Sequence, residues 1–307
     1  MEVIEEEFSY ESRIDIGGQL KQEDSINSMI LSDGTRVFVV CDGHGIHGQL
    51  ISNLVIESVN LTSFDLIDWP TLFDQLESIV FEEESNYHVN AVVLGRNIKS
   101  LKSHSGTTCS IIAIKDNVLK WAHVGDSDIV HVRGTDIRKI SVNHSPLSRD
   151  EWERVQLCTG SKIEFQYACR PKCKSAKDRY IHPDKPLPVP VLQSNGQTIH
   201  WCYHKNVSDE LGTVVHHTYN KLSMTRSLGD FWGKGLGLTS EPSFGEVRLE
   251  KDDILFVATD GFWDNWKLAE LGVVTNMEQW FNETKQRGQD NFGDDQDNMA
   301  GFLIKIH

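Results

Sequence analysis

The chain lacks long hydrophobic runs and any excess of positive charge. Its 307 residues carry 30 Lys and Arg against 45 Asp and Glu, for a net charge of −15. Apolar runs such as Val37–Cys41 fall far short of the roughly 18 residues that span a bilayer. The acidic balance argues against a basic surface for nucleic acid and against an anchor to an anionic membrane. We therefore expect neither nucleic acid nor a membrane among its partners.

Cysteine is scarce, and the N-terminal residues include no apolar stretch. The sequence has six Cys, and it begins MEVIEEEF, without the basic and apolar regions of a secretory signal. We expect reduced thiols and a cytoplasmic or nuclear location. Cys173 and Arg179 have the Cys-x5-Arg spacing of a thiol phosphatase loop, but the residues between them include no Gly. We interpret this spacing as coincidence.

Short apolar segments with strand-like composition alternate with a few helical patterns. Helical spacing of apolar residues predicts helices over Ile51–Val59 and Leu72–Val80, and Ser148 with Glu151 predicts a capping box that opens a helix through Val155. No repeat or linker divides the chain, so we expect one domain over residues 1–307. The predicted strands are Arg36–Cys41, Thr108–Ile114, Val118–Val124, Asp128–Val132, Ile137–Val142, Ile254–Ala258 and Ala300–Ile306.

The segment from about residue 157 to 220 departs from this pattern. It is rich in Cys, His, Lys and Pro, and Lys162–Lys185 carries seven Lys or Arg against three acids. Long irregular insertions in compact domains are often functional, and we expect a flap-like insertion here. Four cysteines and two histidines allow a structural zinc site, but paired spacing is present at one end only, so free thiols are the preferred interpretation. These residues are Cys158, Cys169, Cys173, Cys202, His200 and His204.

Acidic residues stand at the ends of several apolar segments. Asp42, Asp126 and Asp260 follow predicted strands, Asp297 precedes the last one, and Glu23-Asp24 precedes the apolar-rich Ile26–Leu31. Five such positions, most of them beside Gly or Asn, suggest that the carboxylates converge on one site. Oxygen ligands without clustered His or Cys favour Mg²⁺ or Mn²⁺ over Zn²⁺.

Several short motifs follow one another from about residue 17 to residue 306. Val39–Gly45 contains the sequence DGHG, which resembles the signature of the metal-dependent protein phosphatases of type 2C. The whole ordered set resembles the motifs of that family, and this order is far more specific than DGHG alone. The other members of the set are Gln22–Asp24, Ser105–Thr108, Val124–Ser127, Asn143–Pro146, Thr225–Asp230, Ala258–Asp264 and Asp297–Met299.

The resemblance implies an α+β fold, a four-layer αββα sandwich with two central, mostly antiparallel sheets. It implies two Mg²⁺ or Mn²⁺ ions per site, with Asp42 bridging them and a weaker third ion served by Asp126 and Asp260. It also implies that His44 is the general acid for the leaving seryl or threonyl oxygen. We interpret Arg226 and Asp230 as structural. The implied metal ligands are Glu23, Asp24 (beside it or through water), Asp42, Gly43 through its carbonyl, Asp126, Asp260 and Asp297.

The sequence departs from the family pattern at three places. Gln19 stands where the family usually has an Arg that binds substrate phosphate, and an amide cannot offer a charged bidentate fork. Asp128 follows Val124–Ser127 where the family usually has Arg, and the family's DHKP is here Asn143–Pro146. These changes bear on catalytic efficiency rather than on the fold.

These residues together predict a metal-dependent protein serine/threonine phosphatase in which metal-activated water attacks the phosphomonoester. We expect phosphoprotein substrates and a monomer. The alternative is a weak or inactive pseudophosphatase that keeps the fold and acts as a binding module. Gln19 and Asp128 favour that alternative, whereas the intact Asp42, Asp260 and Asp297 favour the enzyme. A hydrolase of small phosphate esters is a third interpretation.

Overall fold

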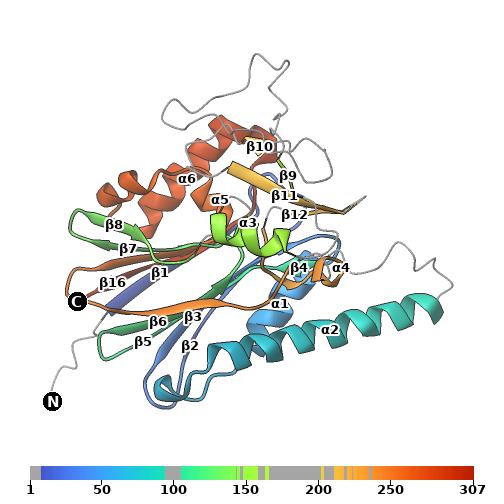
Figure 1. Ribbon diagram of the computed structural model, residues 1–307. Coiled ribbons are helices and arrows are strands. Elements are labelled where there is room, and N and C mark those ends of the chain that lie inside the picture. Colours follow the sequence, from blue (N-terminus) through green and yellow to red (C-terminus); the bar gives the residue numbers. More distant parts are fainter. Residues whose placement is uncertain are drawn as a thin grey trace.

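Two antiparallel sheets lie face to face in the computed structural model, with helices on both outer sides (Figure 1). The structure describes residues 8–93, 105–142, 144–145, 148–157, 163–165, 202–203, 211–217, 220–222, 224–234 and 237–307. The first sheet has the strand order β1 (Phe8–Asp15), β16 (Met299–Ile306), β15 (Ile254–Ala258), β7 (Ile129–Arg133) and β8 (Asp136–Lys139).

The second sheet is built around β3, the central strand of the candidate site. Its order is β13 (Leu228–Gly229), β4 (Gly106–Thr107), β3 (Arg36–His44), β5 (Cys109–Lys115), β6 (Val118–Val124) and β14 (Ser243–Arg248), and β2 (Asp24–Ile30) also pairs with β3. The described parts of residues 157–220 include β9 (Ile163–Phe165), β10 (Cys202–Tyr203) and β11 (Leu211–His217), which form a small separate sheet with β12 (Asn220–Leu222).

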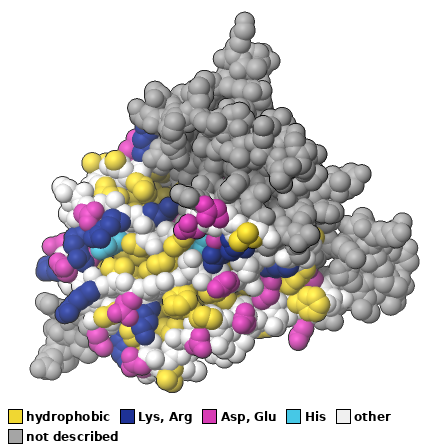
Figure 2. All heavy atoms as spheres, viewed as in Figure 1, with side chains coloured by type: hydrophobic (Ala, Val, Ile, Leu, Met, Phe, Trp, Pro, Cys, Tyr) yellow, Lys and Arg dark blue, Asp and Glu magenta, His cyan; other side chains and the backbone are white. Residues whose placement is uncertain are grey.

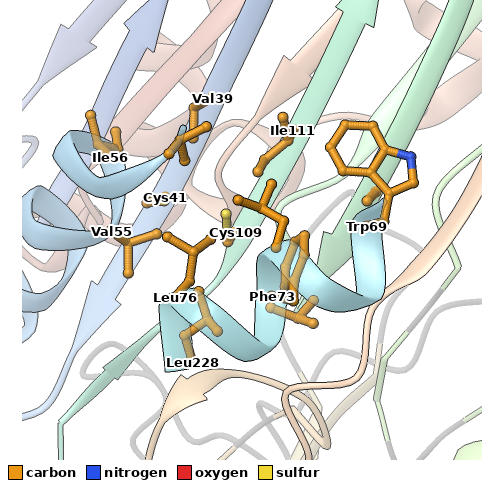
Figure 3. Close-up of a cluster of buried hydrophobic side chains, with 14 of the residues drawn as sticks. Val39, Cys41, Val55, Ile56, Trp69, Phe73, Leu76, Cys109, Ile111 and Leu228 are labelled. Atoms are coloured by element: carbon orange, nitrogen blue, oxygen red, sulfur yellow. The ribbon is translucent and has the colours of Figure 1, made fainter. Parts of the chain in front are cut away.

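Helices cover the outer face of each main sheet. α1 (Gly48–Ser58) and α2 (Trp69–Val93) pack on the second sheet, and Figure 3 shows side chains such as Val55 and Phe73 meeting Val39 and Ile111 of the strands. α5 (Asp260–Trp263), the 3₁₀ helix η4 (Leu268–Val273) and α6 (Met277–Phe292) pack on the first sheet. The shorter helices are η1 (Phe64–Leu66), α3 (Arg149–Gln156), α4 (Phe231–Lys234) and η5 (Gly293–Asp295).

Alternation along β3 explains the layering. Val37, Val39 and Cys41 belong to the core beneath α1 and α2, while Phe38 and Val40 belong to the core between the two sheets. Successive side chains of a strand point to opposite faces, so a strand with apolar residues at every position is buried on both sides. The predicted αββα sandwich with two mostly antiparallel sheets is confirmed.

Most predicted strands are confirmed, with small shifts at their ends. The predicted Ile137–Val142 strand is shorter, because pairing with β7 covers only Asp136–Lys139. α3 begins at Arg149, but the capping box is wrong: the Ser148 side chain makes no cap hydrogen bond, and the Glu151 side chain binds Arg154 and Arg226. α6 was not predicted. It begins where the Asn276 side chain accepts a hydrogen bond from the Gln279 amide at 2.8 Å.

The surface of the described part carries charges of both signs. Figure 2 shows acidic and basic side chains intermingled, with hydrophobic side chains grouped between them. Within the described residues, no helix is both long enough and apolar enough to cross a membrane.

Candidate active site

Asp24 and Asp42 lie opposite each other where β2 begins and β3 ends. Two threonines hold this end of β3. Thr108 donates its N–H to the Asp42 carbonyl and accepts the Asp42 N–H on its hydroxyl, both at 2.9 Å, and the Thr107 hydroxyl donates to the same carbonyl. Both the N–H and the carbonyl of Asp42 are therefore held by hydrogen bonds.

The first sheet contributes further carboxylates to the same edge. Asp260 follows β15 and Asp297 comes just before β16, and these two strands pair with each other. The Thr259 hydroxyl donates to the Asp24 carboxylate at 2.8 Å. Because Asp24 belongs to the second sheet and Thr259 to the first, this bond crosses the seam between the sheets. The candidate site lies at that seam.

The pKa values of these carboxyl groups show how closely they gather. Burial is the largest cause that raises the pKa of Asp24, Asp42 and Asp260 well above the ordinary value. The neighbouring charges raise it further, and for Asp42 they come from Asp24, Asp260, Asp297 and Asp126. Five segments of the chain thus contribute carboxylates that repel one another.

Glu23 and Gly43 complete the side of the site formed by β2 and β3. Burial raises the pKa of Glu23, an effect that the charge of Lys21 opposes and that of Asp297 reinforces. The Gly43 amide donates to the Glu23 carbonyl at 3.1 Å. A Cβ on Gly43 would lie 2.3 Å from the Gly48 carbonyl oxygen, so only glycine fits there. Gly43 is thus packed tightly between the backbones of Glu23 and Gly48.

Asn298, beside Asp297, holds the segment that leads into Glu23. Its side-chain oxygen accepts the Glu23 N–H at 2.6 Å, and its side-chain nitrogen donates to the carbonyls of Ile16 and Lys21 at 2.8 and 3.0 Å. The sequence motif Asp297–Met299 contains Asn298, but nothing in the sequence indicates this clamping role.

The donor chemistry fits a hard divalent cation. All the gathered groups are oxygen donors, and their mutual repulsion falls when a cation lies among them. As the side chains are placed, the described residues include no group of three or more His, Cys, Asp or Glu close enough to hold a metal ion. The ligand roles of Glu23, Asp24, Asp42, Gly43, Asp126, Asp260 and Asp297 therefore remain predictions.

His44, the last residue of β3, is paired with a buried carboxylate. Its Nε2 lies 2.6 Å from Oδ2 of Asp230, whose side chain is only 1% exposed. Burial opposes the imidazolium, but Asp230, Asp126 and Glu23 raise the pKa of His44 above its usual value. Burial alone would raise the pKa of Asp230. The charge of His44 outweighs this effect and brings the pKa of Asp230 below its ordinary value. A short hydrogen bond therefore joins the two side chains.

Unusual backbone geometry places Asp230 in this pair. Its φ of 49° lies in the left-handed region, which costs a residue with a Cβ about 1–2 kcal/mol. The Ser227 hydroxyl donates to Oδ2 at 2.7 Å, and the Asp230 amide donates to the Ser105 carbonyl at 2.9 Å. A Cβ on Gly106 would lie 2.2 Å from Oδ2. The sequence interpretation of Asp230 as structural overlooked its contact with His44.

The departures from the family motifs lie at different places in the structure. Gln19 is exposed, and its side chain donates to the Gln296 carbonyl at 3.2 Å, next to Asp297. Asp128 is 4% exposed and binds Lys139 and Ser141, at 2.6 and 2.7 Å. Asp128 is therefore a buried partner of Lys139, and its effect on activity stays a prediction.

One further acid joins the site, and several predicted features lie outside the described residues. The charge of Asp264 further raises the pKa of Asp260. Its position four residues after Asp260 was the signal in the sequence that could have indicated it.

Asn143 and Pro146 are outside the described residues, as are the residues of the thiol loop. So are all the candidate zinc ligands except Cys202, whose backbone lies in β10.

A family model and several curated proteins are similar in sequence to most of this chain. The family model "Protein phosphatase 2C" matches residues 12–169 and 195–289. "Probable protein phosphatase 2C 35" of Arabidopsis thaliana is 27% identical over 74% of this chain and 59% of its own length. "Protein phosphatase 1M" of Homo sapiens is 23% identical over 59% of this chain and 43% of its own length. The chain thus spans about half of the curated relatives it matches.

Solved structures support the fold independently. The serine-threonine phosphatase 2C from Toxoplasma gondii superposes with a TM-score of 0.61 at 17% identity, over 98% of this chain and 95% of that one. Phosphatase Stp1 from Staphylococcus aureus gives a TM-score of 0.55 at 18% identity, over the full length of both chains. The match of the family model over most of the sequence, together with this shared fold, shows that the chain belongs to the protein phosphatase 2C family.

Proposed function

We propose that this protein is a Mg²⁺- or Mn²⁺-dependent phosphatase that hydrolyses phosphoserine and phosphothreonine in proteins. The observation that carries the proposal is that both sheets bring carboxylates to their shared seam, beside the His44–Asp230 pair. Hydrolysis of a phosphate ester depends mainly on positioning and on neutralising charge. Gathered oxygen donors and an adjacent proton donor suit both requirements.

The carboxylates would hold the metal. Asp42 would help to hold two ions, Glu23 would hold one of them, and Asp260 and Asp297 would hold the other. Asp126 would serve a weaker third ion together with Asp260. When bound, the ions would supply Lewis acidity, which lowers the pKa of water and neutralises phosphoryl oxygens.

His44 would donate a proton to the leaving oxygen of the substrate. A seryl or threonyl alkoxide is a poor leaving group, so its protonation during bond breaking lowers the barrier. Asp230 holds the Nε2 side of the ring at 2.6 Å, which orients the imidazole at the end of β3. We further propose that the protein acts as a monomer in the cytoplasm or nucleus.

The first experiment is phosphate release from a phosphothreonine peptide with Mn²⁺, with Mg²⁺ and with EDTA. We expect release that requires the metal and is lost in Asp42→Ala. Metal binding by calorimetry without any release would contradict the enzyme and favour a binding module. Faster turnover of small phosphate esters than of phosphopeptides would favour the third interpretation.

A charge-neutralising pair of variants tests the ligand assignment. Asp260→Asn is expected to lower phosphate release by at least about 10²-fold, because the amide cannot replace an anionic ligand among the other carboxylates. It is also expected to weaken Mn²⁺ binding measured by calorimetry. Asp252→Asn makes the same chemical change at an exposed turn and should leave both quantities unchanged. Wild-type metal-dependent activity in Asp260→Asn would show that the site is assigned wrongly.

A further inference from the structure

Two buried histidines are stacked beside the loop that carries Asp126. His123 lies in β6 and His144 follows β8, and their ring centroids are 4.3 Å apart with an interplanar angle of 13°. Both side chains are 0% exposed. The predicted site does not include either of them.

The hydrogen bonds of the two rings indicate which nitrogen of each histidine carries the proton. His123 Nε2 donates to the Val142 carbonyl at 2.5 Å. His144 Nδ1 accepts the Gly125 N–H at 3.2 Å, so its proton lies on Nε2, which donates to the Ser243 hydroxyl at 2.8 Å. Burial lowers the pKa of His123 to about 3 and also lowers that of His144. Both rings are therefore neutral at physiological pH.

The contact with Gly125 holds a loop that has little other freedom. Gly125 has a φ of 97°, and a Cβ there would lie 2.6 Å from Cγ2 of Thr108. On the other side of Asp126, the Ser127 hydroxyl is hydrogen-bonded to that of Thr108 at 2.6 Å. Asp126 is thus fixed between two anchors, and His144 is the side chain that holds the first of them.

His144 also connects this loop to the segment that carries Asp230. The Thr225 amide donates to the His144 carbonyl at 2.8 Å. The loop that carries Asp126 and the segment Thr225–Asp230 are therefore both hydrogen-bonded to His144. A change at His144 would reach the Asp126 loop through the side chain and the Thr225–Asp230 segment through the backbone.

We propose that His144 is a positioning residue that aims Asp126 at the metal site by accepting the Gly125 N–H. This inference rests on the proposed function. Without the acceptor, the buried N–H of Gly125 loses its partner, and the Val124–Gly125 peptide that leads to Asp126 is held less firmly. The weakest-bound metal ion is then affected most, because Asp126 is assigned to that ion.

Two substitutions of His144 separate the two ring nitrogens. In His144→Asn the amide oxygen occupies approximately the position of Nδ1 and keeps an acceptor for Gly125. In His144→Gln the longer side chain reaches instead toward Ser243. We expect His144→Gln to weaken the weakest Mn²⁺ binding step in calorimetry about tenfold, the effect of one lost buried hydrogen bond. Phosphopeptide kcat should fall with it, while KM stays nearly constant.

His144→Asn is expected to stay within about threefold of the wild type in both measurements, since it retains the acceptor. Ser243→Ala, which removes only the Nε2 partner, is expected to bind Mn²⁺ like the wild type. Equal effects of Asn and Gln at position 144, or a tenfold loss in Ser243→Ala, would overturn the proposal. If His144→Gln fails to fold, a tenfold loss of Mn²⁺ affinity in His144→Asn would still overturn it.

The binding measurement separates this proposal from the proposed function. A wild-type protein that releases no phosphate would contradict the phosphatase activity. The Mn²⁺ titrations of the His144 and Ser243 variants would still report on the loop that carries Asp126.

Discussion

At the scale of single residues, the site depends on a strained aspartate. Asp230 has a left-handed backbone, and the cost is offset by hydrogen bonds from His44 and Ser227 and from its own amide to Ser105. Strain of this kind persists where the surroundings over-determine it, and such positions often belong to functional sites. Neither the left-handed turn nor the contact with His44 is visible in the motif Thr225–Asp230.

Asp230→Asn tests whether this contact serves the chemistry. We expect turnover of a phosphothreonine peptide to fall about 10²-fold, the lower end of what general acid catalysis contributes. Turnover of p-nitrophenyl phosphate should change much less, because nitrophenolate leaves without being protonated. The measurement is kcat for both substrates under saturating Mn²⁺.

His44→Ala provides the comparison for that experiment. It should show the same preference for the good leaving group, and the double variant should lose little more than either single one. A loss in Asp230→Asn that is equal for both substrates would mean that Asp230 only supports the fold.

At the scale of elements, α3 is held by ion pairs rather than by its cap. Glu151 is 3% exposed; Arg226 and Arg154 approach its carboxylate at 2.6 and 2.7 Å, and the Thr225 hydroxyl donates to it at 2.5 Å. Burial opposes its charge, but these partners lower the pKa of Glu151 to about 2. The network ties α3 to the segment that leads to Asp230.

Glu151→Gln is expected to lower the free energy of unfolding at pH 7 by about 3 kcal/mol, the equivalent of the lowered pKa. A carboxyl group with a lowered folded-state pKa stabilises above its unfolded pKa. Its contribution is lost as the pH falls toward about 2. The difference between variant and wild type should therefore shrink between about pH 5 and pH 2.

Urea unfolding at several pH values measures this difference. Asp150→Asn, an exposed position on the same helix, is the control and should change stability by less than about 0.5 kcal/mol. A constant difference from pH 7 to pH 3 would contradict the role assigned to Glu151.

The sequence predicts the bounds of β6 and β15 but misses α6, for physical reasons. The apolar-rich segments of β6 and β15 are bounded by turn residues or acids. α6 has few apolar residues, and Trp280 and Met277 anchor it through contacts with β15 and its neighbours. The Ser148–Glu151 pattern is local, whereas Arg226, one of the two arginines that bind Glu151, is 75 residues away along the chain.

At the scale of the whole molecule, the candidate site belongs to neither sheet alone. The sequence predicted the carboxylates, because each one ends or precedes an apolar run. It could not predict the hydrogen bond from Thr259 to Asp24, since the relative placement of two packed sheets leaves no local pattern. The clamp formed by Asn298 on Glu23 is hidden for the same reason.

Added metal is expected to raise the melting temperature. A ligand at 100 times its Kd stabilises the folded state by about 2.7 kcal/mol, which corresponds to several degrees for a domain of this size. Scanning calorimetry with increasing Mn²⁺ measures the shift. Asp260→Asn should show a smaller shift than Asp252→Asn, and an equal shift in both would place the bound ion elsewhere.

The position of the candidate site at the seam between the sheets links the expected rise in melting temperature to folding itself. The predicted ligand groups lie on both sheets, and the bond from Thr259 to Asp24 joins the two sides, so these groups stay together only while the sheets remain packed. Folding and metal uptake would then be two halves of one thermodynamic cycle. The ion concentration around the protein would set the fraction of chains that are folded, and with it how long each chain resists proteolysis.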